Sequence, residues 1–315
     1  MTQNPIEAEG LVRTFGEVRA VEGVDLTVGE GEIFGFLGPN GAGKSTTVRM
    51  LTTLLKPTGG RARVAGYDVV AQAPMVRRSI GVALQDAAID PLMTGTELMR
   101  LQAVLHGIPR ATAEKRSGEL LERVGLTAAA HRRVGTYSGG MRRRLDLAMS
   151  LIHEPIVLFL DEPTTGLDPT SRLNLWDEVR NLNHDGTTVF LTTQYLEEAD
   201  ELAGRIAIID HGNIVREGRP SDLKAAVGAP TLKVEVASGQ EATAKETLAR
   251  FGDERVARTG VLAIGLVDGA AEMTAVVRAL DEAGVEVRHL ELDAPTLDDV
   301  FADATGYRLE GAAPT

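Results

Sequence analysis

The sequence predicts an α/β fold for most of its 315 residues, and three observations carry that prediction. Residues 38–45 form a glycine-rich loop, which joins an apolar run at residues 33–37 to a segment with helical spacing at residues 44–55. Two further apolar runs, residues 157–160 and 188–192, are typical of buried parallel strands, and the segment between them has helical spacing. Strands that alternate with helices in this way indicate a parallel sheet covered by helices.

Two more segments complete the core in chain order. Residues 10–28 and 32–37 alternate or run apolar around glycine turns, which predicts short strands that lead into the loop. Residues 91–135 are rich in alanine, leucine and charged residues, with Pro91 and Pro109 as breaks. They predict a helical insertion between the two halves of the core.

The composition narrows the class of protein. With 45 acidic and 33 basic residues, the chain has a formal net charge of −12, which argues against a protein that works by attraction to nucleic acid or anionic lipid. It has no cysteine, so it has no disulfide or thiolate site, which fits a reducing compartment. The start of the chain lacks the pattern of a secretory signal, and no apolar run approaches the roughly 20 residues of a membrane span. We therefore expect a cytosolic protein that needs another polypeptide for any passage across a bilayer.

The glycine-rich loop has the G-x-x-x-x-G-K-[ST] spacing of a phosphate-binding loop. Its residues are Gly38, Pro39, Asn40, Gly41, Ala42, Gly43, Lys44 and Ser45. Glycines leave backbone N–H groups open to phosphate oxygens, and the dipole of the following helix favours anions. We expect Lys44 to reach the β and γ phosphates, Ser45 to coordinate Mg²⁺, and Thr46 to contact the α-phosphate. A plain glycine turn with an exposed lysine is the alternative for this octapeptide alone.

The apolar run at residues 156–160 ends in two carboxylates, Asp161 and Glu162. At the tip of a strand beside the phosphate loop, Asp161 can hold Mg²⁺ directly or through water, and Glu162 can polarise the water that attacks the γ-phosphate. An acidic pair at a strand end is often only a solvated turn. Here the preceding apolar run and the upstream loop favour the catalytic interpretation.

A second turn with exposed backbone N–H groups precedes another helical pattern. It consists of Ser138, Gly139 and Gly140, and the helix is expected over residues 142–151. Taken alone, Ser138 would be an ordinary helix cap. Two phosphate-facing surfaces so far apart in one chain indicate that each subunit completes the site of another.

Together and in this order, these motifs resemble the nucleotide-binding subunits of ATP-binding-cassette (ABC) transporters over about residues 10–220. The resemblance implies a P-loop NTPase fold of ABC type, with a RecA-like core, an antiparallel β subdomain and a helical subdomain at about residues 86–150. It also implies a homodimer with two ATP molecules sandwiched between the subunits. In that arrangement residues 38–46 of one subunit face the Ser138–Gly140 turn of the other.

The same resemblance assigns roles to single residues. Phe15 matches the aromatic residue that stacks on adenine, Gln85 the glutamine that joins Mg²⁺ and the attacking water to the membrane partner, and Asp168 the loop that contacts the opposite subunit. Gln194 departs from the family, because most members have a histidine there that contacts the γ-phosphate. An amide cannot become cationic, so it should stabilise developing charge less well, and we expect slow hydrolysis.

Three strings narrow the resemblance to the daunorubicin-resistance branch of antibiotic exporters: residues 137–146, 192–200 and 297–301. In that branch the ATPase pairs with a separate integral-membrane permease. The resemblance therefore implies a subunit on the cytoplasmic face of the cell membrane that uses ATP and Mg²⁺ to power export of a drug-like or antibiotic compound. The compound itself is not written in this chain, because the ATPase need not touch it.

The alternatives are a soluble ABC ATPase that acts on ribosomes or DNA, and a slow-hydrolysing module that senses nucleotide. Gln194 is the only support for the second. The conspicuous basic cluster has little aromatic interleaving in an acidic protein, so no nucleic acid is expected as a partner. A helix face at the contact with the dimer mate or the permease is the preferred interpretation of this cluster, which consists of Arg132, Arg133, Arg142, Arg143 and Arg144.

The texture of the sequence changes near Pro220, which predicts a boundary there. Residues 1–220 form the ABC-type ATP-binding domain, residues 221–308 a smaller accessory α+β domain, and residues 309–315 a disordered tail. Strand-like and helix-like segments alternate in the accessory domain, and a strand at residues 255–258 would give the β-α-β-β-α-β order of a ferredoxin-like fold. Its role stays open between a dimer clamp, a ligand sensor and a brace for the membrane partner.

Overall fold

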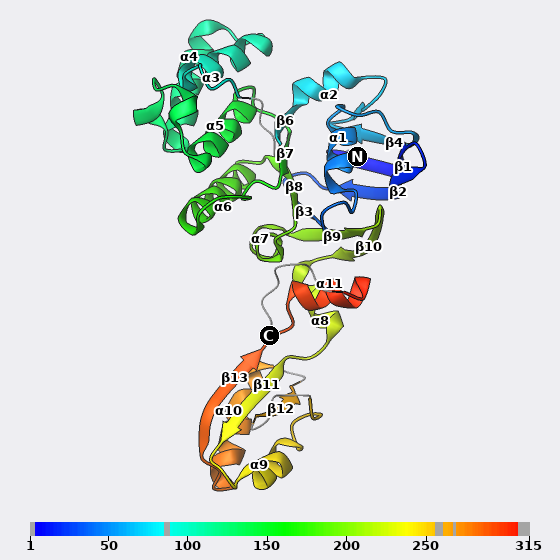
Figure 1. Cartoon of the computed structure of the whole chain (residues 1–315), viewed down its shortest axis with the longest axis vertical. Helices are drawn as coiled ribbons and strands as arrows, with labels where there is room; N and C mark the ends of the chain where they lie inside the picture. The colour runs from blue at the N-terminus through cyan, green and yellow to red at the C-terminus, as the bar shows by residue number, and fades with distance from the viewer. Residues whose placement is uncertain (1–3, 85–88, 256–260, 267–268, 308–315) are drawn as a thin grey trace. The chain divides into compact units, whose positions relative to one another are not determined.

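The computed structural model describes residues 4–84, 89–255, 261–266 and 269–307. The chain divides into two compact units, Met1–Pro220 and Ser221–Thr315. Figure 1 shows both, and each is described by itself.

The first unit contains two sheets. The antiparallel sheet has the strand order β2-β1-β4-β5, and the six-stranded sheet has the order β10-β9-β3-β8-β7-β6. In the second sheet the strands from β9 to β6 are parallel, and β10 runs antiparallel at the edge. The strands are β1 (Ile6–Phe15), β2 (Val18–Val28), β3 (Ile33–Leu37), β4 (Gly59–Val64), β5 (Tyr67–Asp68), β6 (Ile80–Ala83), β7 (Val157–Asp161), β8 (Thr188–Thr193), β9 (Arg205–Asp210) and β10 (Asn213–Gly218).

Helices follow most of the parallel strands. The helices of this unit are α1 (Lys44–Leu51), α2 (Ala73–Ser79), α3 (Gly95–Leu105), α4 (Arg110–Arg123), α5 (Gly139–Leu151), α6 (Pro169–His184) and α7 (Leu196–Leu202). Helix α8 (Pro220–Val227) begins at the last residue of this unit and belongs to the second. Two short 3₁₀ turns, Thr127–Ala129 and Val134–Thr136, lie between α4 and α5. This is the α/β cassette that the resemblance implies.

The central strands are buried throughout and mostly apolar, because both faces of the sheet are covered. Every residue of β3, β7 and β8 is buried. The Phe190 ring lies at the centre of this core, with its centroid 5.5 to 5.7 Å from those of Phe34, Phe36 and Phe159. Continuous apolar runs are what parallel strands need when helices lie on both sides.

The register of these strands brings their carboxyl ends together. Leu37 of β3 is level with Thr193 of β8, and Asp161 of β7 is level with Thr192. The phosphate loop follows β3, and the acidic pair ends β7. Both therefore meet at one edge of the sheet, which we call the carboxyl edge.

The helical subdomain has an apolar core of its own. Helices α3, α4 and α5 contribute to it, with Leu98, Met99, Leu121 and Leu145 among the buried side chains. In Figure 1 these three helices gather away from the sheet that holds β1, β2 and β4. The side chains of Thr94 and Glu97 form a capping box that begins α3.

The structure corrects two details of the sequence analysis. The helix after the phosphate loop ends at Leu51 and not near residue 55, because Thr53 has a φ of 67° and no longer continues the helix. The opening β segment consists of two long strands, β1 and β2, and not of several short ones. The helices and strands between residues 59 and 83 were not predicted individually.

The second unit is a three-stranded antiparallel sheet with two helices packed on it. The sheet has the order β12-β11-β13, and its core includes Leu232 and Val234 of the central strand with Leu248 and Leu280 of the helices. Its elements are β11 (Thr231–Val236), α9 (Glu241–Leu248), β12 (Leu262–Gly265), α10 (Ala270–Glu282), β13 (Val287–Asp293) and α11 (Leu297–Thr305).

The order and direction of these strands agree with a β-α-β-β-α-β fold in which a fourth strand lies outside β12. Glu254 makes an isolated antiparallel bridge to Ile264 of β12, on the side where that strand belongs. Residues 256–260 lie outside the described residues, and so do residues 308–315. The predicted strand at residues 255–258 and the predicted disordered tail therefore stay predictions.

Candidate nucleotide site

The backbone of the phosphate loop can be built only with glycine at two positions. A Cβ atom on Gly38 would lie 2.3 Å from the carbonyl oxygen of Ile209, and one on Gly43 would lie 2.1 Å from that of Ala20. Gly43 also has a φ of 95°, in the left-handed region that glycine adopts most easily. Strands β9 and β2 therefore hold the loop in a tight curve over the first turn of α1, where backbone N–H groups can meet an anion.

Lys44 turns back over this loop and is buried. Its Nζ donates to the carbonyl oxygen of Gly38 at 2.9 Å and forms an ion pair with Glu162 Oε1 at 3.3 Å. The lysine and glutamate side chains are only 3% and 6% exposed. An exposed lysine on a plain glycine turn, the alternative for this motif, does not describe this arrangement.

Asp161 lies next to the start of α1. The hydroxyl of Ser45 donates to Asp161 Oδ1 at 3.4 Å, and the hydroxyl of Thr192 donates to the same oxygen. Thr192 belongs to β8, which lies between β3 and β7. Thr192 is not among the residues predicted for the site, although two threonines that end an apolar strand are a visible signal.

Glu162 has an unusual backbone for a residue other than glycine, with a φ of 47°. Its N–H donates to the carbonyl oxygen of Thr192 at 3.0 Å, and its Oε2 accepts from the hydroxyl of Thr165 at 3.3 Å. Left-handed residues of this kind are uncommon and often occur at functional sites.

These residues fit a nucleotide and a divalent cation. The loop is a cradle that side chains would fill, the buried Lys44 supplies a positive charge, and Ser45 and Asp161 offer a hydroxyl and a carboxylate, which Mg²⁺ prefers. Across the described residues no group of three or more His, Asp or Glu could hold a metal. The remaining ligands of a Mg²⁺ ion here would come from phosphates and water.

Comparisons with known proteins agree with this geometry. Residues 21–165 match the ABC transporter family, and residues 218–305 match the C-terminal domain of ATP-binding proteins like DrrA1-3. A daunorubicin resistance ATP-binding protein of Streptomyces coeruleorubidus is 47% identical over 97% of each chain. The daunorubicin/doxorubicin resistance ATP-binding protein of Streptomyces peucetius is also 47% identical, over 96% of this chain and 92% of that protein. The chain belongs to the ABC transporter family.

It is an ATP-binding subunit of that family and an ATP hydrolase. Among solved structures, a dimeric ATP-binding cassette in a post-hydrolysis state, bound to ADP and Pi, resembles it with a TM-score of 0.63 and 27% identity. That likeness covers 68% of this chain and 98% of the cassette. In the described part of this ABC subunit, no helix is both long and apolar enough to cross a membrane.

The second turn of the ABC subunit begins α5. The hydroxyl of Ser138 accepts from the N–H of Met141 at 3.2 Å. Ser138 is therefore also an ordinary helix cap, which was the alternative interpretation of this turn. Asp168 caps α6 in the same way, because its carboxylate accepts from the N–H of Ser171 at 3.0 Å. Hydrogen bonds from Ser171 lower the pKa of Asp168 below its usual value. The two caps are neighbours, since a Cβ on Gly140 would lie 3.2 Å from Ser171 Oγ.

Of the other predicted residues, Phe15 and Gln194 lie in the described part of the chain. Phe15 ends β1, is 46% exposed and has the guanidinium of Arg13 over its ring at 4.5 Å. Gln194 directly follows β8 at the carboxyl edge and is partly buried. Gln85 lies outside the described residues, so its predicted role stays a prediction.

The basic cluster does not form one helix face, which corrects the sequence analysis. Arg143 is mostly buried, with its guanidinium against backbone carbonyls, and Arg144 donates to the carbonyl oxygen of Val124 at 2.8 Å inside the helical subdomain. The guanidinium of Arg132 lies over the Tyr137 ring at 6.0 Å. Arg143 and Arg144 contact the interior of the domain, whereas Arg132, Arg133 and Arg142 are exposed. The sequence showed only that the five arginines are close along the chain.

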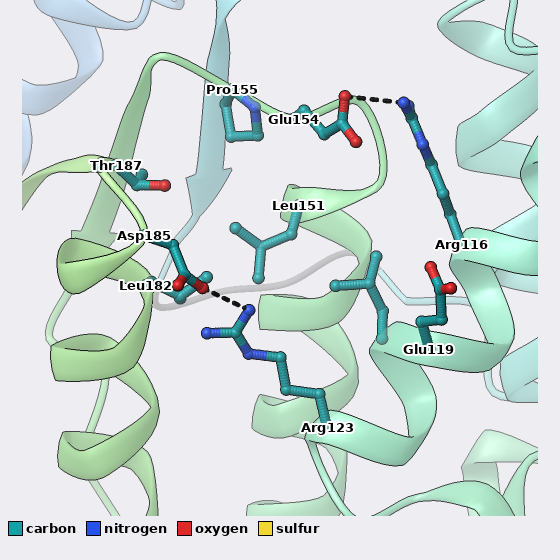
Figure 2. A pocket seen from close by; sticks show the side chains of 11 residues that line it. Arg116, Glu119, Arg123, Leu151, Glu154, Pro155, Leu182, Asp185 and Thr187 are labelled. Carbon is teal, nitrogen blue, oxygen red and sulfur yellow. Dashed lines mark ion pairs between the residues drawn. The ribbon is translucent and has the colours of Figure 1, made fainter.

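Two cavities lie at opposite edges of the six-stranded sheet. The first, of about 380 Å³, is lined by Glu162, Thr165 and Leu167 together with Gly139 and Arg143 of α5. The second, of about 480 Å³, lies where β7 and β8 begin. Figure 2 shows Leu151 and Leu182 in this second cavity, with the ion pairs Arg116–Glu154 and Arg123–Asp185 around it.

Proposed function

We propose that this ABC subunit binds MgATP with residues 38–46, Asp161 and Glu162, and that a second copy closes the site with its Ser138–Gly140 turn. The convergence of Lys44, Ser45, Asp161 and Glu162 at the carboxyl edge carries this proposal. The dimeric form of the similar cassette bound to ADP and Pi supports the second copy. Phe15 would stack on adenine, and Asp168 would contact the opposite subunit.

Each side chain then has a chemical role. Lys44 binds the β and γ phosphates, and this interaction competes with its ion pair to Glu162. The freed carboxylate of Glu162 accepts a proton from the attacking water, while Gln85 and Gln194 donate or accept neutral hydrogen bonds around the reacting phosphate. A Mg²⁺ ion held by Ser45 and Asp161 would neutralise negative charge on the phosphates. Because Gln194 cannot become cationic, turnover should be slower than with a histidine there.

We further propose that hydrolysis powers export of a drug-like or antibiotic compound through a separate integral-membrane permease. The support is the names of the relatives, which are daunorubicin and doxorubicin resistance proteins at 47% identity. The subunit would then work at the cytoplasmic face of the cell membrane, held there by the permease.

Replacement of Glu162 tests the nucleotide site. Glu162→Gln should keep ATP affinity, reduce turnover by about 10²-fold or more and trap the ATP-bound dimer, because the amide keeps the shape but cannot accept the proton. The matched control is Glu154→Gln, an exposed carboxylate at the second cavity. Labelled-ATP hydrolysis, nucleotide binding and light scattering are the measurements. Equal loss of binding and turnover would refute the role of Glu162.

Export is tested with the membrane partner. A neighbouring open reading frame with about six hydrophobic segments of roughly 20 residues each is the candidate permease. Co-expression of the two chains should lower daunorubicin accumulation in cells, and Lys44→Met should abolish that effect. If accumulation is unchanged although ATP hydrolysis is intact, the substrate class is wrong and the nucleotide site is not.

A further inference from the structure

Arg143 connects helix α5 to the segment that carries the acidic pair. Its Nη2 donates to the carbonyl oxygen of Asp161 at 2.7 Å, and its Nε donates to that of Pro163 at 3.0 Å. These are the residues immediately before and after Glu162. A third bond, from Nη1 to the carbonyl oxygen of Leu84 at 2.5 Å, reaches the residue that directly follows β6.

This side chain is held where a cation is costly. It is 12% exposed, and burial lowers the pKa of Arg143. Four carboxylates act on it and oppose that effect: Asp146, at 3.7 Å on the next turn of α5, and Asp161, Glu198 and Glu162. Removal of one partner from such a buried group of charges is costly, and a planar guanidinium can reach several carbonyls at once.

The backbone that Arg143 contacts is also the strained one. Glu162 has a φ of 47°, and β8 fixes its N–H through Thr192. Residues in such sparsely populated conformations persist only where the surroundings hold them. Arg143 holds the peptide group just before Glu162 and the one just after Pro163, so the direction of the carboxylate depends on the position of α5.

We propose that Arg143 is a positioning residue for ATP hydrolysis, which ties the orientation of Glu162 to helix α5 and thus to the Ser138–Gly140 turn at the start of that helix. The inference rests on the proposed role of Glu162 as the residue that polarises water. Arg143 itself need not touch nucleotide. Through Arg143, a shift of α5, which begins at the Ser138–Gly140 turn, would change the orientation of the Glu162 carboxylate.

Arg143→Gln tests this with Arg144→Gln as its control. Arg144 lies on the same helix and also donates to one buried carbonyl, but within the helical subdomain. Arg143→Gln should keep ATP affinity and lower kcat by about 10- to 100-fold, because a displacement of about 1 Å in a catalytic group has effects of that size. Arg144→Gln should keep both. Loss of ATP affinity in parallel with kcat would overturn the proposal.

Arg143→Lys covers the case in which the glutamine variant does not fold. The lysine keeps the buried charge beside Asp146 but lacks the planar fork that spans the two carbonyls. Its thermal midpoint should stay close to that of the unchanged chain, with kcat between those of the unchanged chain and Arg143→Gln. An Arg143→Lys variant with full kcat would show that the charge alone suffices and would refute the positioning role.

A double-mutant cycle with Glu162→Gln closes the test. If Arg143 acts through Glu162, then Arg143→Gln should lower residual turnover little further when Glu162 is already glutamine. The same fold-loss in both backgrounds would overturn the inference while the site proposal stands. If Glu162→Gln alone keeps normal turnover, the site proposal itself fails.

Discussion

The two edges of the six-stranded sheet handle charge in opposite ways. At the carboxyl edge, Lys44 and Glu162 are almost fully buried and make several polar contacts each. At the amino edge, around the second cavity, Arg116 and Arg123 are 29% and 32% exposed, and their partners Glu154 and Asp185 are 71% and 61% exposed. Arg123 also pairs with Glu178, which is 11% exposed. The strands are the same, so the difference lies in the segments that follow and precede them.

This difference shows what burial adds to a charge. An exposed ion pair competes with water and salt and contributes little, whereas removal of one partner from a buried pair leaves the other uncompensated. The carboxyl edge brings Lys44, Ser45, Asp161 and Glu162 to one point. At the amino edge, the Arg116–Glu154 pair lies between side chains that water can reach.

Of the substitutions that test this comparison, Lys44→Met should have the largest effect on turnover. It removes the buried cation that we expect to contact the phosphates, so turnover should fall by on the order of 10²-fold or more with weaker ATP binding. Arg123→Met at the amino edge should leave turnover unchanged. Steady-state hydrolysis and nucleotide titration measure both, and equal losses would erase the functional distinction between the edges.

Two glycines sharpen the comparison through stability. Gly43→Ala should destabilise the fold by about 1–3 kcal/mol or more, because its φ is 95° and the new Cβ would lie 2.1 Å from the Ala20 carbonyl oxygen. Gly118→Ala, in α4 beside the amino edge, should stabilise it by about 0.5–1 kcal/mol, because nothing lies within 4 Å. Urea unfolding gives both values. Similar midpoints for the two variants would contradict the prediction.

The pH dependence of stability should separate two desolvated groups, Asp146 within α5 and His153 just after it. Burial raises the pKa of Asp146 to about 6, against the opposing effect of Arg143, so its contribution to stability is full below pH 3.8 and is lost as the pH rises through about 6. Burial lowers the pKa of His153, stacked on His106 at 3.8 Å, to about 4. Its contribution is full above pH 6.5 and is lost as the pH falls through about 4.

The two groups therefore act in opposite directions between about pH 4 and 6. The measurement is the free energy of unfolding of Asp146→Asn and of His153→Gln, minus that of the unchanged chain, at each pH in this range. The two differences should change with pH in opposite directions. Parallel slopes would mean that one of the two side chains titrates normally.

The smallest effect is expected for the Arg116–Glu154 pair at the amino edge. A double-mutant cycle should give a coupling of about 0.2–1 kcal/mol, because the glutamate is largely exposed. The coupling should weaken as the salt concentration rises from about 0.05 to 0.5 M, because added salt shortens the Debye length and screens exposed charges. A coupling that is large and independent of salt would make this edge resemble the other.

Much of the cassette could be predicted because its central strands are covered on both faces. Continuous apolar runs such as residues 157–160 stand out from the rest of the sequence, and few turns apart from phosphate loops have the spacing of residues 38–45. The two-residue strand β5 and the short helix α2 could not be predicted, since β5 is partly exposed and forms only by pairing with β4, and α2 has a single buried residue, Val76. The local sequence pattern predicts little where contacts with distant segments determine the secondary structure.

The candidate site shows the same limit. Lys44, Asp161 and Glu162 follow from motif spacing, but the fold alone places Thr192 between them and turns Arg143 inward. In the sequence Arg143 is one of three consecutive arginines, and nothing distinguishes it from Arg142 or Arg144. Its role depends on the direction of one side chain in a helix, and periodicity does not separate a charge that contacts backbone from one that contacts water.

The left-handed backbone of Glu162 divides the substitutions at this position into two kinds. Gln retains an unbranched Cβ, so it changes the reactivity of the residue and leaves the local geometry intact. Val or Ile would crowd that φ and would disturb the chain itself, with a lower melting temperature as the sign. Inactive alleles at one codon would then have two distinct causes, and a melting curve would tell a chemical lesion from a conformational one.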